Sequence, residues 1–167
     1  MQIVHILLMM TKQRAAMRFL SPPRILAIDH VVLRTSKLSA MLEFYIDVLG
    51  CTLERERLDI GLTQLRAGSA LLDLVTVSSE LGKLGGKAPS QNGRNMDHFC
   101  LQVTAFDEQQ LLDYFARKQV QVAEFTERYG AQGFGRSIYL TDPEGNIVEI
   151  KPSKPITDNG ENPDSLS

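Results

Sequence analysis

The sequence predicts an α+β fold in which two βαβββ modules form a cup-shaped mixed sheet with helices on its outer face. Three observations lead to this prediction: two similar segments, a glycine-rich stretch between them, and the same order of apolar patterns in each segment. Such a repeat defines the architecture, because each copy is one supersecondary unit. We place the modules at 25–77 and 95–152, with a linker at 78–94.

Each module opens with a short β-prone run that contains an Asp-His pair, at 28–33 and at 96–101. A helical pattern follows in both modules. Apolar residues recur at helical spacing over 38–49, and Gly50 is placed to end that helix. In the second module Asp107 is suited to cap the helix at its N-terminus.

Three strands are then predicted to complete each module. They are 52–58, 62–66 and 70–77 in the first, and 120–126, 136–141 and 146–151 in the second. The glycine-rich stretch 131–135 is compatible with a hairpin turn or with a mobile loop over the cup.

Both ends of the chain lie outside the modules. Residues 1–24 carry basic side chains and no acid, which is typical of a targeting peptide or of a dispensable extension. Residues 153–167 are polar and rich in Pro, Asn, Asp and Ser, so we predict a disordered tail.

Composition restricts the partners. The net charge of −2, with acids and bases well mixed, argues against a nucleic-acid binder, which would show a basic face. No apolar run approaches the roughly 20 residues that span a bilayer. The two cysteines lack metal-binding or disulfide spacing, so we expect a protein of the reducing cytoplasm.

Each module offers one histidine on its first strand and one carboxylate on its last strand. These are His30 and Asp73 in the first module, and His98 and Glu149 in the second. A single histidine in a strand is more often a surface or hydrogen-bonded residue than a ligand. The equivalent positions of both pairs in the repeat favour a joint site. This mixed N/O set suits one divalent metal ion, such as Ni, Co, Zn, Mn or Fe.

At this point the chain resembles the vicinal oxygen chelate superfamily, which includes glyoxalase I, fosfomycin-resistance enzymes, bleomycin-resistance proteins and extradiol dioxygenases. The matching motifs are IDHVVLRTSKLSAMLEFYIDVLGCTL, SALLDLVTV, MDHFCLQV and YLTDPEGNIVEI, and together they cover nearly all of 25–152. The resemblance implies paired βαβββ modules in an open cup, often completed or doubled by a homodimer, and the lack of a bilayer-spanning run predicts no membrane partner.

The resemblance also implies roles for individual residues. The family's metal positions fall on His30, Asp73, His98 and Glu149, although glyoxalase I has Glu where this chain has Asp73. Glu149 would be the catalytic base that moves a proton through a metal-stabilised enediolate. Arg34 would bind a substrate carboxylate, as in a glutathione adduct. Glyoxalase I tends to have Asn four residues after the second ligand, whereas this chain has Val77.

Three functions follow as expectations. The first is a glyoxalase I-like lyase or isomerase that chelates a small substrate through neighbouring oxygens. The second is an Fe(II)-dependent ring-cleaving dioxygenase that uses His30, His98 and Glu149 as a facial triad. The third is a non-catalytic binding or resistance protein, whose relatives usually lack the metal ligands.

Overall fold

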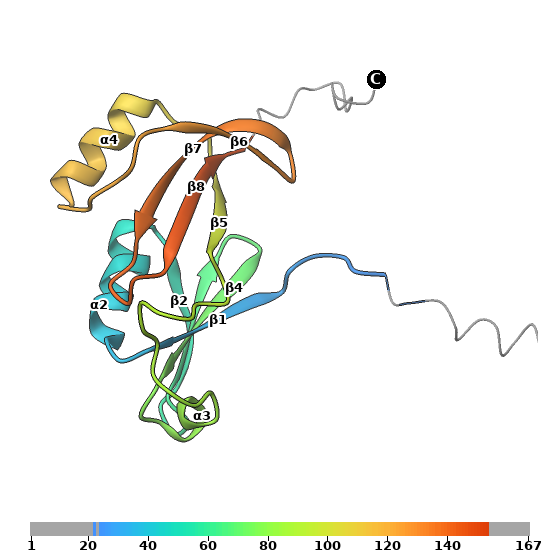
Figure 1. The fold of residues 1–167 in the computed structure, drawn as a ribbon, viewed down its shortest axis with the longest axis vertical. Coiled ribbons are helices and arrows are strands. Elements are labelled where there is room, and N and C mark those ends of the chain that lie inside the picture. Colours follow the sequence, from blue (N-terminus) through green and yellow to red (C-terminus); the bar gives the residue numbers. More distant parts are fainter. Residues whose placement is uncertain (1–21, 23, 154–167) are drawn as a thin grey trace, which may run out of the picture.

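Two four-stranded sheets with the same strand order make up the chain (Figure 1). The structure, a computed structural model, describes residues 22 and 24–153. The first sheet has the order β1-β4-β3-β2 and the second β5-β8-β7-β6. The strands are β1 (His30–Thr35), β2 (Thr52–Arg57), β3 (Leu62–Ala67), β4 (Ala70–Thr76), β5 (His98–Val103), β6 (Thr126–Gly130), β7 (Gly133–Thr141) and β8 (Ile147–Pro152).

The first and last strands of each module pair in parallel, and the remaining pairs are antiparallel. The predicted fold of two βαβββ modules is therefore confirmed. The predicted N-terminal extension and C-terminal tail lie almost entirely outside the described residues, so both remain predictions.

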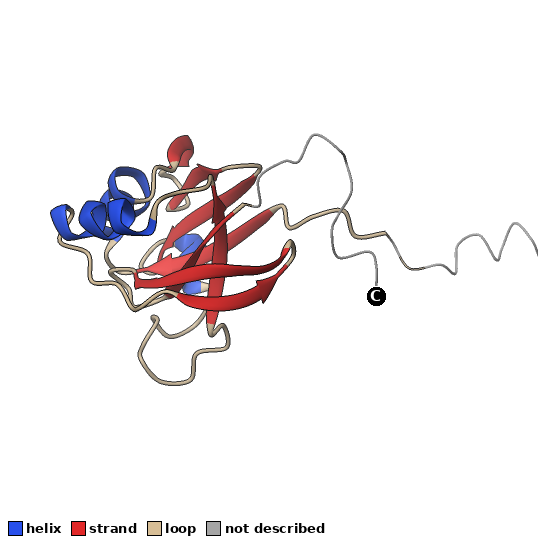
Figure 2. Ribbon diagram, turned by 90° about the horizontal axis from the view of Figure 1, so that it is seen from above, coloured by secondary structure: helices blue, strands red, loops and turns tan. Residues whose placement is uncertain are grey.

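The helices α2 (Leu38–Leu42) and α4 (Glu108–Arg117) lie on the same side of the molecule (Figures 1 and 2). Met41 and Phe115 of these helices are buried in a core that both sheets share. The opposite face of each sheet is left open, as Val32 on β1 illustrates with a relative exposure of 50%. The expected cup with its helices outside is thus present.

The first helical segment is not one continuous α-helix. After α2 the chain continues as a π-helical segment, η1 (Glu43–Val48), in which one extra residue widens each turn. Gly50 ends the segment with a φ of +75°, as its position in the sequence predicts. In the second module Asp107 caps α4, since its Oδ1 accepts a hydrogen bond from the Gln110 N–H at 2.9 Å.

The strand predicted at 120–126 is wrong. Val122 forms only an isolated bridge with Leu140, and the true strand β6 begins at Thr126. The tight hairpin between β6 and β7 decides the pairing, because Gly130 faces Gly133 across two turn residues. Gly133 has a φ of +80°, so of the two interpretations of 131–135 the hairpin turn is confirmed.

The linker contains one short helix, α3 (Glu80–Lys83), that the sequence did not predict. The Ser79 hydroxyl caps it by accepting a hydrogen bond from the Gly82 N–H at 3.0 Å. No helix in the described part of the chain is both long enough and apolar enough to cross a membrane.

The turn between β7 and β8 joins the two modules. Asp142 is buried, and its carboxylate accepts hydrogen bonds from the Tyr45 hydroxyl at 2.8 Å and from the Asn146 backbone N–H at 2.7 Å. Glu144 accepts a hydrogen bond from the Thr35 hydroxyl at 2.6 Å. Residues 142–146, called the β7–β8 turn below, therefore connect the second sheet to β1 and η1 of the first module.

Tyr45→Phe tests this connection. The substitution leaves part of the buried Asp142 carboxylate without its donor, so we expect a loss of about 1–3 kcal/mol in the free energy of unfolding. Urea denaturation of both proteins measures the difference. The matched control is Tyr129→Phe, because Tyr129 is 74% exposed and should change stability by less than about 0.5 kcal/mol. Equal stability of Tyr45→Phe and wild type would contradict the prediction.

Candidate metal centre

The two predicted histidine–carboxylate pairs occupy the same register in the two sheets. In the first, His30 lies two residues before Val32, which pairs with Asp73. In the second, His98 lies two residues before Cys100, which pairs with Glu149. The repeat in the sequence is therefore also a repeat of side-chain positions, with each histidine diagonal to its carboxylate across a parallel strand pair.

An aspartate directly before each histidine fixes the orientation of its ring. His30 Nδ1 lies 2.7 Å from Asp29 Oδ1, and His98 Nδ1 lies 2.7 Å from Asp97 Oδ2. Histidines that bind metals usually make such a bond through one ring nitrogen, which presents the other nitrogen to the metal. The Nε2 atom is the nitrogen left for coordination in both modules.

The carboxylates are buried, unlike the histidines. Asp73 has a relative exposure of 5%, and both of its oxygens lie 3.1 Å from the amide Nε2 of Gln64, which donates to them. Gln64 is the direct cross-strand neighbour of Asp73 on β3. The hydrogen-bond donor of this carboxylate is a neutral amide, and Asp73 forms no ion pair within the described ranges.

The second module brings its pair closer together. His98 Nε2 lies 3.2 Å from Glu149 Oε2, and Glu149 has a relative exposure of 6%. Tyr139 occupies on β7 the cross-strand position beside Glu149 that Gln64 occupies beside Asp73. Its ring meets the imidazole of His98 edge-on at 5.5 Å between centroids, which holds that imidazole in place.

The surroundings of the candidate site shift the pKa values of His30 and Cys100. The bond to Asp29 raises the pKa of His30 above its ordinary value, and the charges of Asp73 and Asp29 act in the same direction. Partial burial, and next the Glu149 carboxylate, raise the pKa of the Cys100 thiol to about 11. Cys100 is therefore a neutral thiol at pH 7 and not a ready nucleophile.

Within residues 22 and 24–153, no group of three or more His, Cys, Asp or Glu side chains is placed to hold one metal ion. The structure thus brings together His98 and Glu149 in one sheet and places His30 near Asp73 in the other, as two half-sites. Their donor types fit a divalent first-row metal, because neutral imidazole nitrogens and carboxylate oxygens are ligands such ions accept.

Comparison with known proteins identifies the family of this chain. The model of the Glyoxalase/Bleomycin resistance protein/Dioxygenase superfamily matches residues 27–150. The chain belongs to this superfamily. No curated protein sequence matches it.

Solved structures share the fold. An integron cassette protein from Vibrio cholerae has a TM-score of 0.63 at 24% identity, over 80% of this chain and all (100%) of that one. A virulence protein from Salmonella typhimurium has a TM-score of 0.65 at 25% identity, over 79% and 100% of the two chains. A lactoylglutathione lyase from Agrobacterium tumefaciens has a TM-score of 0.55 at 23% identity, over 80% and 96%.

Arg34, predicted to bind a substrate carboxylate, is engaged by the linker. Its two terminal nitrogens donate four hydrogen bonds of 2.7–2.9 Å to backbone carbonyls of Gly82, Gly85, Gly86 and Lys87. These bonds tie the linker to β1. A substrate carboxylate would have to displace some of them, so a substrate-binding role for Arg34 remains a prediction without support from its contacts.

Several neighbours of the candidate ligands were not predicted from the sequence. Asp29 and Asp97 had a visible signal, because the same Asp-His pair occurs twice at equivalent positions. Gln64 and Tyr139 had none, since their relation to the carboxylates arises only from the cross-strand register.

Asp29→Asn tests the pairing of His30. Because Asp29 favours the protonated ring, we expect the pKa of His30 to lie above 6.5 in the wild type and to fall in the variant. Protonated His30 then stabilises the folded wild type fully at pH values below the ordinary histidine pKa. This stabilisation is lost as the pH rises through the raised pKa of His30. NMR titration of the imidazole signals in metal-free protein measures the pKa of His30 in wild type and variant. Asp47→Asn is the control, since Asp47 is far in sequence from His30. An unchanged His30 pKa in Asp29→Asn would refute the prediction.

Proposed function

We propose that this protein is a metal-dependent lyase or isomerase of the glyoxalase type, which acts on a small substrate with neighbouring oxygen atoms. His30, His98 and Glu149 are the proposed ligands of one divalent metal ion, and Asp73 is the fourth. The metal is Ni, Co, Zn, Mn or Fe. The observation that carries the proposal is the duplicated register, in which each sheet offers an Asp-oriented histidine beside a buried carboxylate.

The burial of the carboxylates supports a metal role. A charged carboxylate that is almost completely buried costs several kcal/mol unless a cation or hydrogen bonds compensate it. Among the described residues the one ion-pair contact of Glu149 is with the half-exposed His98 imidazole, and the Gln64 amide donates to Asp73. A divalent ion bound through both modules would satisfy both carboxylates.

We further propose that a second copy of the chain completes the site. The two pairs lie in different sheets and do not meet as a group in the described chain. A twofold dimer can place the first module of one copy opposite the second module of the other, because an isologous interface uses the same patches twice. The open face of β1, with His30 and the half-exposed Val32, is the surface such a partner would cover.

In this proposal the metal, the histidines and Glu149 have different roles in the reaction. When bound, the metal polarises the neighbouring oxygens of the substrate as a Lewis acid. His30 and His98 hold it through Nε2, and Asp29 and Asp97 keep their rings in the required orientation. Glu149 takes the proton from the substrate carbon and returns it at the adjacent carbon, as a general base and acid.

Metal analysis and one assay test the function. We expect purified wild type to bind one divalent ion per chain and to convert the methylglyoxal–glutathione adduct. Glu149→Gln should lower kcat about 10²–10⁴-fold, since it removes the base. His98→Ala should weaken metal affinity on the order of 100-fold, whereas His5→Ala, outside the repeat, should not. Wild type without metal would overturn the site, and metal without turnover would overturn only the glyoxalase reaction.

Mixed dimers test the second copy. His30→Ala and His98→Ala chains, co-expressed with different tags and purified through both, should regain about half of the wild-type metal content, because one of the two sites is then intact. The matched control pairs His98→Ala with Glu149→Gln, which leaves both sites damaged in the second module and should regain none. Failure of the first pair to regain metal, or to co-purify, would overturn the shared site.

A further inference from the structure

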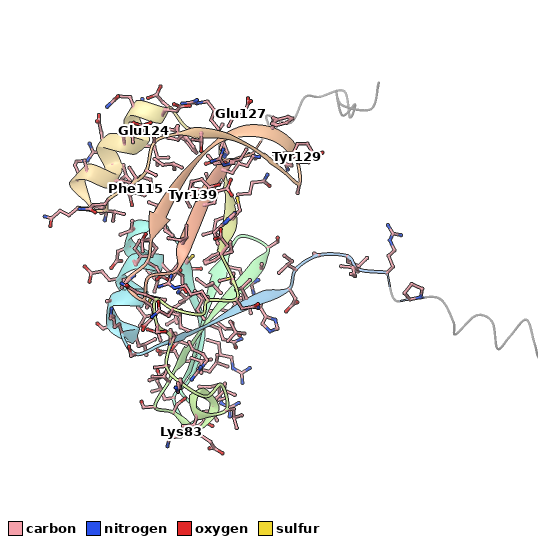
Figure 3. The ribbon with its side chains drawn as sticks, in the orientation of Figure 1. Lys83, Phe115, Glu124, Glu127, Tyr129 and Tyr139 are labelled. Atoms are coloured by element: carbon pink, nitrogen blue, oxygen red, sulfur yellow. The ribbon has the colours of Figure 1, made fainter. Side chains whose placement is uncertain are left out.

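A cavity of about 330 Å³ lies beside Glu149, between the open face of the second sheet and the β6–β7 hairpin. Side chains of β5 and β8 form its floor, and the hairpin residues Tyr129–Gln132 form its wall. Figure 3 labels Tyr129 of this hairpin. The floor comprises His98, Cys100, Gln102, Glu149 and Lys151. A volume of this size suits a small molecule.

Lys151 is the one cation on this floor. It follows Glu149 by two residues on β8, so both side chains lie on the same face of the sheet. Its relative exposure is 7%, and its ammonium donates hydrogen bonds to the carbonyl oxygens of Gly133, at 2.9 Å, and Arg128. No carboxylate of residues 22 and 24–153 forms an ion pair with it.

The hairpin is shaped around this side chain. A Cβ atom on Gly130 would lie 3.1 Å from Lys151 Nζ, and one on Gly135 would lie 3.0 Å from Lys151 Cε. Both distances are shorter than ordinary van der Waals contact, so any side chain at these positions would press on the lysine. Gly130 and Gly135 therefore leave room for the Lys151 side chain under the hairpin.

The fold itself does not require a lysine here. Lys151 pairs with Gln102 of β5, and the equivalent position of the first sheet, which pairs with Arg34 of β1, is Val75. The first module closes the same four-stranded sheet with a valine there. The lysine is thus an addition of the second module, at the place where that module faces the cavity.

A buried ammonium is costly unless its charge is compensated. Two neutral carbonyls accept two of its three N–H donors, and neither carries a compensating charge. Engagement of Glu149 by a metal would leave Lys151 without a nearby negative charge.

We propose that Lys151 makes this cavity a binding site for the carboxylate of a small organic acid. Carboxylate binding at Lys151 follows from the cavity alone. That the bound acid is the substrate rests on the proposed function. The single buried ammonium matches the one charge of a carboxylate, whereas a phosphate dianion would find no second buried cation on the described floor. Gln102 offers an amide to a second oxygen of the ligand.

The test separates the lysine from the metal. Glu149→Gln removes the neighbouring negative charge and a proposed metal ligand, so carboxylate binding can be measured in metal-free protein. The probes are lactate and lactamide, which have the same shape and differ in charge. NMR titration follows the backbone N–H signals of Ala131 and Gln132 in the hairpin. Second substitutions in this background are Lys151→Met, Lys151→Gln and, as a matched control, Lys83→Met on exposed α3 at the opposite end of the molecule (Figure 3).

We expect Glu149→Gln, alone or with Lys83→Met, to bind lactate about tenfold or more tightly than lactamide. Both Lys151 double variants should bind the two probes equally. Lys151→Gln removes the charge but keeps an N–H donor for the hairpin carbonyls. It therefore tests the charge alone if Lys151→Met disrupts the hairpin or unfolds the protein. A lactate preference that survives loss of Lys151, or no preference in Glu149→Gln, would overturn the carboxylate site. Absence of metal from wild type would instead overturn the proposed function alone.

Discussion

The buried carboxylate of Asp142 is the constraint on which the relation of the two modules depends. It receives the Tyr45 hydroxyl from the first module together with the backbone N–H and side-chain amide of Asn146 from its own turn. These three donors compensate a charge that would otherwise be costly to bury. Burial raises the pKa of Tyr45, and the charge of Asp142 and its hydrogen bond raise it further, so the phenol stays a donor. Glu144 and Pro143 add contacts to the start of the first helical segment.

Fixing the β7–β8 turn also fixes the position of the candidate ligands. The turn leads directly into β8, which carries Glu149, and β8 pairs with the whole of β5, which begins at His98. The turn thereby sets the register of the second half-site while it holds the end of β1, the strand that begins at His30. The same few residues therefore join the modules and anchor one strand of each half-site.

Much of this fold could be predicted from the sequence, because the repeat, the strand alternation and the Gly50 helix end are local signals. The strand placed at 120–126 failed because Val120 and Val122 alternate as a strand does, whereas the hairpin pairing of Gly130 with Gly133 determines the real strand. The candidate ligands were visible as repeated residue types. Gln64, Tyr139 and Lys151 were not, since their roles come from neighbours across strands.

The repeat is symmetric in its candidate ligands, and the residues around them differ between the modules. Gln64 donates an amide to Asp73, whereas Tyr139 packs its ring against His98 at the equivalent position. Each module also carries a cation on this face, at positions that are not equivalent. Arg34 in the first module is held by linker carbonyls, and Lys151 in the second lies at the floor of a cavity. Duplication thus explains why two histidines and two carboxylates recur, while divergence around them assigns different work to each half. In the first module the linker carbonyls account for the cation Arg34, whereas in the second module Lys151 faces a cavity, as the proposed carboxylate site requires.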